Sequence, residues 1–204
     1  DCRIFSGAVL PAIPQDLKFQ GESTTVEIGD RSTIRECVTI NRGTKAYGKT
    51  VVGKDCLIMA YVHIAHDCIL GDHVILVNSV ALAGHVEIGD YAIISGLSAV
   101  HQFVKIGAHV MIGGGAMVRK DVPPFITAAG EPLAYAGVNS VGLKRRDFSQ
   151  DEINEIQTLY RTLYQSGMNV SQAVKKIKET YSKRPEADAI LSFIEQSDRG
   201  LIRK

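Results

Sequence analysis

The sequence predicts an all-β domain, a parallel β-helix, followed by a small α-helical domain. Three observations carry this prediction. Aliphatic residues recur every six positions through most of residues 1–124, and a small or β-branched residue stands four positions after each of them. Beyond residue 124 this period gives way to helix-capping signals. Neither an α-helix nor a β-hairpin has a six-residue period, so the repeat indicates a solenoid.

The aliphatic series is unbroken over a long central stretch: Val52, Ile58, Ile64, Leu70, Leu76, Leu82, Ile88, Ile94, Val100, Ile106, Ile112 and Val118. Side chains two apart in an extended chain share a face, so each hexad contributes an inward pair before a bend, as Val62 and Ile64 do. Three hexads then make one triangular coil. Successive coils stack as parallel strands about 4.8 Å apart.

The second series holds the small inward positions: Cys56, Val62, Cys68, Val74, Val80, Val86, Ala92, Ser98, Val104, Val110 and Ala116. We expect its two cysteines to be inert core residues. The period fails over residues 11–25, which predicts an exposed loop, and residues 41–50 predict a smaller one. Because Ile4 and Leu10 are already in phase, we expect earlier coils before Asp1 in the full protein.

Helical signals follow the stretch DVPP. Ser149 and Glu152 form a capping box for a helix that Gly167 would end. Ser171 is predicted to cap a second helix, and Pro185 to begin a third. The sequence thus predicts three parts: a β-helix over 1–124, a connecting segment over 125–148 and a helical domain over 149–204.

Composition narrows the functional classes. The chain has 204 residues, 45% of them hydrophobic, and a net charge of +1, which allows a substantial core and shows no bias toward nucleic acid. No apolar stretch approaches the roughly 20 residues of a membrane-spanning helix, so we expect a soluble protein without a membrane span. The four cysteines have neither CxxC spacing nor the density of a disulfide scaffold, which favours a reducing cytoplasm.

Histidines converge on one edge of the predicted coil. When residue numbers are reduced by the coil length, four of the six fall within a few positions of one another: His63, His66, His85 and His101. His66, Gly84 and Gln102 form one column, and Asp67 lies beneath His85. Three stacked coils span about 10 Å, which is the size of a small-molecule site.

These residue types suit acyl transfer to a hydroxyl. A neutral imidazole with a pKa of about 6.5 is a good general base, and Asp67 beside His66 can orient it. Gly84 has no side chain, so its N–H can approach a reacting carbonyl and stabilise an oxyanion. One alternative is that these are ordinary surface histidines at the corners of the coil, without a chemical role. The chemical rival is a zinc site with three imidazoles, although the HIAH spacing does not match the ligand spacing expected for it.

The sequence also resembles a known family, the bacterial UDP-N-acetylglucosamine O-acyltransferases that open lipid A synthesis. The resemblance is carried by IPQDLKFQGE, RECVTINRGT, HIAHDC, LAGHVEIGD, AVHQF, IGAHVMIGGG, VNSVGLKRR and RGLIRK. It implies a left-handed β-helix and a homotrimer with sites between neighbouring β-helices. It implies transfer of a 3-hydroxyacyl chain from acyl carrier protein to the sugar 3-hydroxyl. No metal or cofactor is implied, since phosphopantetheine arrives on the carrier protein.

The resemblance also assigns roles to residues. It makes His66 the general base, Asp67 its orienting partner, Gly84 the oxyanion-hole donor and Gly114 the floor of a hydrocarbon ruler. Further positions match residues that contact the nucleotide sugar or the acyl donor: Asp16, Lys18, His63, His85, His101, Gln102, Asn139 and Arg145. The chain departs from the family pattern at Asn41, where histidine is expected, and at Val141, where glutamate is expected.

Two other functions stay open on the sequence alone. An N-acyltransferase acting later in the same pathway also has an imidazole base on a hexapeptide coil. A non-catalytic solenoid would explain the hexads but not the histidine column. For the favoured function, an acidic carrier protein requires a basic patch on this near-neutral chain, and the predicted members are Arg119, Lys120, Lys144 and Arg146.

Overall fold

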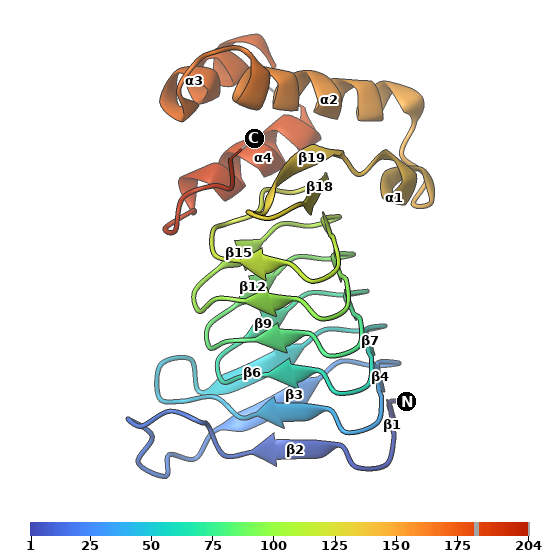
Figure 1. The fold of residues 1–204 in the computed structure, drawn as a ribbon, viewed down its shortest axis with the longest axis vertical. Helices are drawn as coiled ribbons and strands as arrows, with labels where there is room; N and C mark the ends of the chain where they lie inside the picture. The colour runs from blue at the N-terminus through green and yellow to red at the C-terminus, as the bar shows by residue number, and fades with distance from the viewer. Residues whose placement is uncertain (182–183, 204) are drawn as a thin grey trace.

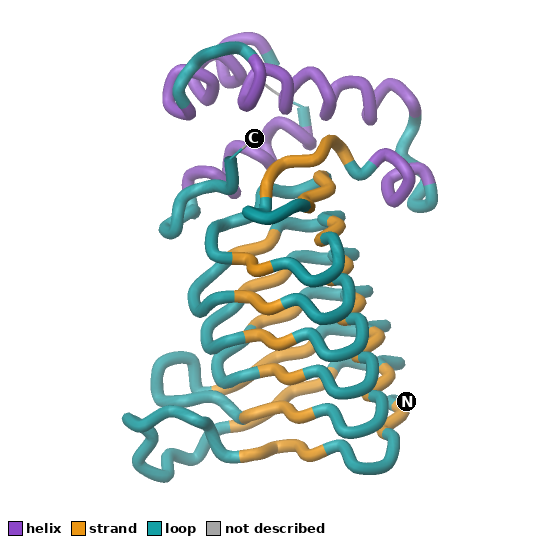
Figure 2. The backbone as a smooth tube through the Cα atoms, viewed as in Figure 1, coloured by secondary structure: helices purple, strands orange, loops and turns teal. Residues whose placement is uncertain are grey.

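The computed structural model describes residues 1–181 and 184–203. Its first part is the left-handed parallel β-helix that the sequence predicts, and helices cover the last coil (Figure 1). The N-terminus lies at the opposite end of the stack from these helices. Figure 2 shows the short strands aligned in columns, with turns at the corners between them.

The strands of the described residues fall into three sheets, which form the faces of a triangular prism. Face A contains β1 (Arg3–Ile4), β4 (Thr33–Ile34), β7 (Leu57–Ile58), β10 (Ile75–Leu76), β13 (Ile93–Ile94), β16 (Met111–Ile112), β18 (Ile126–Ala129) and β19 (Ala134–Val138). Face B contains β2 (Val9–Ala12), β5 (Thr39–Asn41), β8 (His63–Ile64), β11 (Ala81–Leu82), β14 (Ala99–Val100) and β17 (Met117–Val118). Face C contains β3 (Thr25–Ile28), β6 (Lys49–Val52), β9 (Ile69–Leu70), β12 (Glu87–Ile88) and β15 (Lys105–Ile106).

The register confirms the predicted coil. On face A, Leu57 pairs with Ile75 and Ile75 with Ile93, so each coil takes 18 residues. The chain passes from face A to B to C in each coil. We call the turns at residues 65–68, 83–86 and 101–104, which join face B to face C, the B–C corner.

Both predicted series point inward. Every aliphatic residue of the series from Val52 to Val118 is at most 3% exposed, and every small residue from Cys56 to Ala116 at most 4%. Burial of each aliphatic side chain contributes about 1.5–3 kcal/mol to stability.

The cysteines Cys56 and Cys68 are free and buried, as expected. Burial raises the pKa of the Cys68 thiol to about 12, which leaves it unreactive.

The corners depend on left-handed backbone conformations. These recur every six residues, with φ between +54° and +68°, at Asp55, Tyr61, Asp67, His73, Ser79, His85, Tyr91, Leu97, Phe103, His109 and Gly115. For an L-residue this region costs roughly 1–2 kcal/mol, so packing and hydrogen bonds between coils must hold it. Asp67, His85 and Phe103 are therefore stacked at the B–C corner by the repeat itself.

Two loops leave the solenoid. Residues 13–24 lie between β2 and β3, within the predicted segment, and project near the lower end in Figure 1. Residues 42–48 lie between β5 and β6. This second loop packs against the B–C corner, because the backbone N–H groups of Thr44 and Tyr47 both donate to the Asp67 carboxylate.

The connecting segment contains strands and a helix that were not predicted from the sequence. It holds an antiparallel hairpin, in which β18 pairs with β19, and the short helix α1 (Ser140–Lys144). The hairpin continues face A, since Met111 of β16 pairs with Thr127 of β18. The last coil is thereby closed by strands that follow no hexad period.

The helical domain follows the predicted order. Helix α2 (Gln150–Gln165) begins with the expected capping box, and Gly167 follows its end with φ +75°. Helix α4 (Pro185–Glu195) begins at the predicted proline. The predicted cap of helix α3 (Val170–Thr180) is wrong. Asn169, not Ser171, accepts from the N–H of Gln172, whose side chain accepts from the Asn169 N–H in turn.

The C-terminal segment, residues 197–203, returns to the last coil and is held there by a buried carboxylate. Asp121 is 0% exposed and accepts hydrogen bonds from the Lys105 N–H, the Ser197 hydroxyl and the Arg199 N–H. Asp121 also forms a parallel β-bridge with Leu201. In the described part of the chain, none of the helices is long and apolar enough to cross a membrane.

Candidate active site

His66 and Asp67 form a hydrogen-bonded pair at the B–C corner, between β8 and β9. The His66 Nδ1 lies 2.8 Å from the Asp67 Oδ2, and the His66 side chain is 14% exposed. An ionised carboxylate only accepts hydrogen bonds, so Nδ1 carries the proton and Nε2 keeps a free lone pair. The pair has the geometry of a general base with its orienting carboxylate.

Asp67 itself is fully buried and surrounded by donors. It accepts from the Thr44 N–H at 2.9 Å, the Thr44 hydroxyl at 2.7 Å and the Tyr47 N–H at 3.3 Å. Its own N–H donates to the Thr50 hydroxyl oxygen at 2.9 Å. Burial alone would raise the pKa of Asp67, but the hydrogen bonds from Thr44 and His66 outweigh burial and lower it. The carboxylate is thus ionised and held in one orientation.

Gly84 lies directly against the His66 ring, one coil farther along the chain. A Cβ at this position would be 2.6 Å from the His66 Cε1 and 2.7 Å from its Nε2. Only glycine lets the backbone approach the ring this closely. Within the part of the chain that the structure describes, the Gly84 N–H donates no hydrogen bond. It is available to a ligand oxygen beside the base.

His85 and His63 flank this pair. The His85 Nε2 is 3.8 Å from the Asp67 Oδ2, and its ring stacks on Phe103 with a centroid distance of 4.5 Å. On β8, the His63 Nδ1 is 2.7 Å from the Thr39 hydroxyl oxygen. Burial lowers the pKa of both imidazoles, so both are neutral at neutral pH.

The remaining residues predicted near the pair lie at its margins. His101 and Gln102 are exposed and follow β14, two coils beyond His66. Lys18 is exposed in the loop of residues 13–24, and its N–H donates to the Asp16 carboxylate at 3.0 Å. Asp16 lies near His85, where it opposes, together with Asp67, the lowering of the His85 pKa by burial. This loop therefore reaches the B–C corner.

In the folded chain, Asn139 and Arg145 lie away from the His66–Asp67 pair. Asn139 is 8% exposed and caps α1, accepting from the Gly142 N–H while its amide donates to the His109 carbonyl. Arg145 is exposed beside face A, in a groove of about 280 Å³ that Val141 also lines. Face A is opposite the B–C corner, so these two residues do not meet His66 within one chain.

Gly114 follows β16, at the corner where face A turns into face B. It is exposed, and an added Cβ would meet only the Gly96 carbonyl oxygen at 3.6 Å and the Ser95 Cβ at 3.9 Å. Both are ordinary contact distances. A larger side chain therefore fits here without strain, but within one chain Gly114 occupies a different corner from His66.

The predicted basic patch is divided by the fold. Arg119 and Lys120 are exposed at the end of face B, after β17. Arg146 is half-buried at the corner between faces C and A, where its guanidinium donates to the Gly142 and Tyr91 carbonyls and lies over the Tyr91 ring. The β18–β19 hairpin separates the two pairs, so they do not form one patch.

Four contact residues were missed by sequence reasoning: Thr39, Thr44, Tyr47 and Arg199. Thr44 and Tyr47 lie where the six-residue period fails at Ala46, and that failure was the available signal. Arg199 donates from its Nη2 to the His101 Nδ1 at 3.1 Å. No spacing rule links residues so far apart in the chain.

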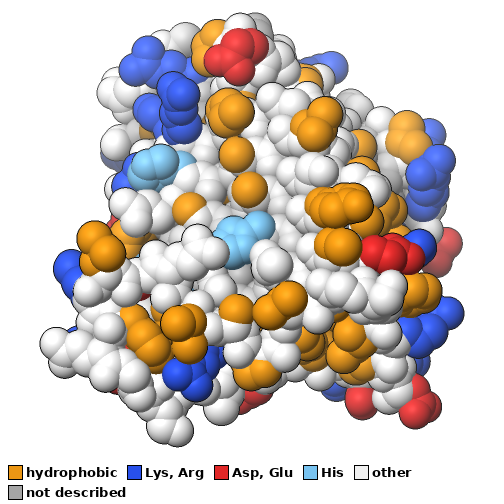
Figure 3. Space-filling view, turned by 60° about the horizontal axis from the view of Figure 1, so that its bottom comes forward, with side chains coloured by type: hydrophobic (Ala, Val, Ile, Leu, Met, Phe, Trp, Pro, Cys, Tyr) orange, Lys and Arg blue, Asp and Glu red, His pale blue; other side chains and the backbone are white. Residues whose placement is uncertain are grey.

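The side chains at the B–C corner include three potential metal ligands. The ligand atoms of His66, Asp67 and His85 all lie within 4.8 Å of one another. However, both oxygens of Asp67 already accept hydrogen bonds, and a metal would have to displace the Thr44 and His66 donors. This donor set suits proton transfer better than zinc. On the face shown in Figure 3, one His group lies near the centre among uncharged and hydrophobic groups, and another lies toward the edge beside Lys and Arg side chains.

Comparisons with known proteins agree with this fold. Residues 49–84 match the family model "Bacterial transferase hexapeptide (six repeats)", and residues 121–202 match "Udp N-acetylglucosamine O-acyltransferase; Domain 2". A relative from Chlorobaculum parvum, named acyl-(acyl-carrier-protein)–UDP-N-acetylglucosamine O-acyltransferase, is 55% identical over 98% of this chain and 76% of its own length. One with the same name from Janthinobacterium is 50% identical over 100% and 79%.

Solved structures match equally well. The UDP-N-acetylglucosamine acyltransferase of Bacteroides fragilis superposes with a TM-score of 0.97 at 51% identity, covering 99% of this chain and 79% of that chain. The Francisella novicida enzyme gives 0.97 at 42% identity, covering 100% and 75%.

The repeat and the corner site thus define a hexapeptide-repeat transferase. More specifically, the chain belongs to the family of acyl-(acyl-carrier-protein)–UDP-N-acetylglucosamine O-acyltransferases.

Proposed function

We propose that this protein transfers a 3-hydroxyacyl chain from acyl carrier protein to the 3-hydroxyl of UDP-N-acetylglucosamine, the first step of lipid A synthesis. Family membership supports the donor and the acceptor. The observation that carries the chemistry is the His66–Asp67 pair packed against Gly84. It sets a base, its carboxylate and an unoccupied N–H donor side by side.

The reaction follows from this geometry. The His66 Nε2 removes the proton of the sugar hydroxyl as its oxygen attacks the thioester carbon. The resulting oxyanion accepts a hydrogen bond from the Gly84 N–H. When the tetrahedral intermediate collapses, the C–S bond breaks and the pantetheine thiolate takes the proton from His66. Asp67 stabilises the imidazolium throughout and is not itself protonated.

The location of Arg145 supports a shared site. Its guanidinium suits a nucleotide diphosphate, yet it lies on face A, away from His66. A single chain cannot present both groups to one sugar nucleotide. We therefore propose a cytoplasmic homotrimer in which Arg145 of one chain serves the His66 of its neighbour. The scheme uses no metal and no cofactor other than the phosphopantetheine that arrives on the carrier protein.

The test is an incubation with acyl-loaded carrier protein and UDP-N-acetylglucosamine. An ester product supports the proposal. An amide formed only with UDP-3-O-acylglucosamine would assign the chain to the later N-acyltransferase step, and no product with either acceptor would favour a non-catalytic solenoid.

A variant identifies the base in the same assay. His66→Ala should lose about 10²- to 10⁴-fold in kcat, because the proton acceptor is gone. Circular dichroism and sedimentation check that the variant folds and assembles. Near-normal turnover in a folded variant would exclude His66 as the base. Stoichiometric zinc that is lost in this variant would move the assignment to metal chemistry.

A further inference from the structure

The C-terminal segment places a cation on the B–C corner. Asp121 is buried and fixes the backbone of this segment through the Ser197 hydroxyl at 2.6 Å and the Arg199 N–H at 3.2 Å. From this anchored position the Arg199 guanidinium reaches the His101 ring. Residues almost a hundred positions apart are thereby joined at the edge of the candidate site.

His101 has two contacts at the same ring nitrogen, and they require opposite protonation. Its Nδ1 is 3.1 Å from the Arg199 Nη2 and 3.2 Å from the Gln102 carbonyl oxygen. A guanidinium only donates, so the first contact requires an unprotonated Nδ1. A carbonyl only accepts, so the second requires a protonated Nδ1. Whichever contact dominates decides which tautomer a neutral His101 adopts.

We propose that Arg199 is a positioning residue that holds His101 in the tautomer with its proton on Nε2. The charged donor makes the stronger hydrogen bond, and the Asp121 anchor keeps the Arg199 backbone within reach of His101. His101 then presents an N–H donor, not an acceptor, to whatever binds beside it. Without Arg199, Nδ1 donates to the Gln102 carbonyl and Nε2 becomes an acceptor.

The groove beside His101 indicates which substrate uses this donor. Ala99, Val100, Met117 and Arg119 line it together with His101, in a space of about 140 Å³. Met117 and Arg119 also line a second groove of about 240 Å³, whose other walls include Pro132, Leu133 and Ile202. The rim of the second groove also carries Lys120, Arg203 and one carboxylate, Glu131. Apolar walls with cations at the rim suit the pantetheine arm, whose amide carbonyls are acceptors. Resting on the proposed function, we assign the Nε2–H of His101 to a carbonyl of the acyl donor.

The tautomer can be measured without substrate. In protein labelled with ¹⁵N-histidine at a pH of about 8, where imidazoles are largely neutral, long-range ¹H–¹⁵N spectra distinguish the two forms. His101→Gln identifies the signals of His101. We expect the Nε2–H tautomer in the wild type and a shift toward the Nδ1–H tautomer in Arg199→Gln. Arg199→Lys, which keeps a charged donor, should restore part of the wild-type population.

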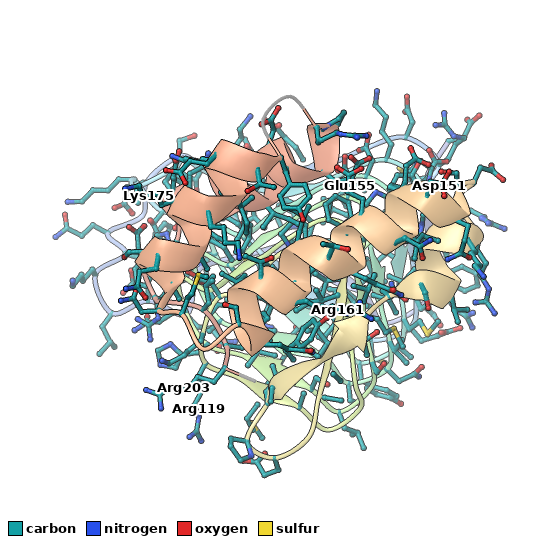
Figure 4. All side chains as sticks on the ribbon, turned by 90° about the horizontal axis from the view of Figure 1, so that it is seen from above. Arg119, Asp151, Glu155, Arg161, Lys175 and Arg203 are labelled. Atoms are coloured by element: carbon teal, nitrogen blue, oxygen red, sulfur yellow. The ribbon has the colours of Figure 1, made fainter. Side chains whose placement is uncertain are left out.

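Arg203→Gln is the matched control. It removes the same charge from the same segment, and Arg203 lines the second groove beside Arg119 (Figure 4) without a contact to His101 in the described residues. The His101 tautomer should be unchanged in this variant. If Arg199→Gln leaves the tautomer unchanged, or Arg203→Gln shifts it equally, the proposal is overturned.

Kinetics test the assignment to the donor. Arg199→Gln should raise KM for the acyl-loaded carrier protein roughly five- to tenfold and leave KM for the sugar nucleotide within about twofold, since one hydrogen bond to the donor is lost. A larger effect on the nucleotide would overturn this assignment. If the wild type shows no acyl transfer while the tautomer responds as expected, the proposed function fails and the role of Arg199 stands.

Discussion

Gly84 is the position of the candidate site where we expect activity to be most sensitive to a substitution. We predict that Gly84→Ala lowers kcat by about 10²- to 10³-fold, because the new methyl group would overlap the His66 ring and displace it from the oxyanion donor. Steady-state kinetics with both substrates measure the loss. Thermal unfolding should change much less than kcat, since the His66 ring lies outside the aliphatic core of the coil.

Gly114→Ala is the control for this change. It adds the same methyl group to another glycine, where the nearest atom would be 3.6 Å away. With a short acyl donor, which does not reach the predicted ruler, turnover should stay within a few-fold of wild type. Equal losses in the two variants would show that the effect at Gly84 is not specific to His66.

At the residue scale, the sequence predicted the positions of His66 and its neighbours on the coil better than the positions of the residues that hold them in place. The coil period alone aligned His66 with Gly84 and Asp67 with His85, because a fixed repeat converts sequence spacing into position. It could not place Thr44 or Arg199, since both come from segments that do not follow the repeat. The roles of the named site residues stay predictions until the variants are measured.

Among the elements, the corner between faces C and A carries a continuous stack of rings. His73 lies on Tyr91 with a centroid distance of 4.4 Å, Tyr91 on His109 at 5.0 Å and His109 on Phe125 at 5.7 Å. The His109 Nδ1 is buried without a hydrogen-bond partner in the described chain. Burial, and then the nearby Arg146 charge, lower the pKa of His109 from 6.5 to about 4.

This stack makes stability depend on pH. Between pH about 4 and about 6.5 the unfolded chain binds a proton at His109 that the folded chain does not, so stability falls as pH falls through this window. At pH 5 the loss is at most about 2 kcal/mol. His109→Phe keeps the stack and should remove this part of the pH dependence, measured by denaturant unfolding at pH 7.5 and at pH 5.

Tyr91→Phe is the comparison, because it alters the neighbouring ring without removing a group that titrates in this window. Its effect on stability should be the same at both pH values. A His109→Phe effect that is also independent of pH would contradict the lowered pKa of His109.

The elements themselves differed in how well the sequence predicted them. The hexads give one strand per six residues because burial of two inward side chains dictates the bend. The α2 capping box and the proline of α4 also act locally, and both predictions are confirmed. The β18–β19 hairpin and α1 have no such local signal. They are held by pairing with β16 and by the Asn139 bonds, which only the folded chain brings together.

For the whole molecule, the role of Gly114 as the floor of an acyl-chain ruler stays a prediction. Because the Gly114 site is open, we predict a preference for long 3-hydroxyacyl donors, and that Gly114→Met shifts it toward shorter chains without abolishing catalysis. Each buried CH₂ contributes about 0.8 kcal/mol, so the shift should be clear in kcat/KM over a donor series. An unchanged length profile would place the end of the groove elsewhere.

Donor docking is the second property of the whole molecule. We predict that charge reversal at Arg119 and Lys120 raises KM for the acidic carrier protein more than KM for the nucleotide, and that the effect weakens as salt is added. Reversal at Lys144 is the comparison, since it lies beyond the hairpin. Equal effects on both substrates would contradict docking at this end of face B.

The 18-residue coil gives the molecule a simple rule for change in length. Inserting a whole coil between Phe103 and Asp121 would keep every side chain on its own face, but it would move the helical domain and the C-terminal segment one strand spacing farther from the site. Arg199 would keep its face and lose its contact with His101. Inserting a single hexad in the same place would rotate everything beyond it by a third of a turn. Arg199 would then face the wrong side of the prism, while the His66–Gly84 contact, made between adjacent coils below the insertion, would survive. Lengthening by a whole coil therefore preserves the faces of the prism and lengthening by one hexad does not, but either one separates His101 from its C-terminal partner.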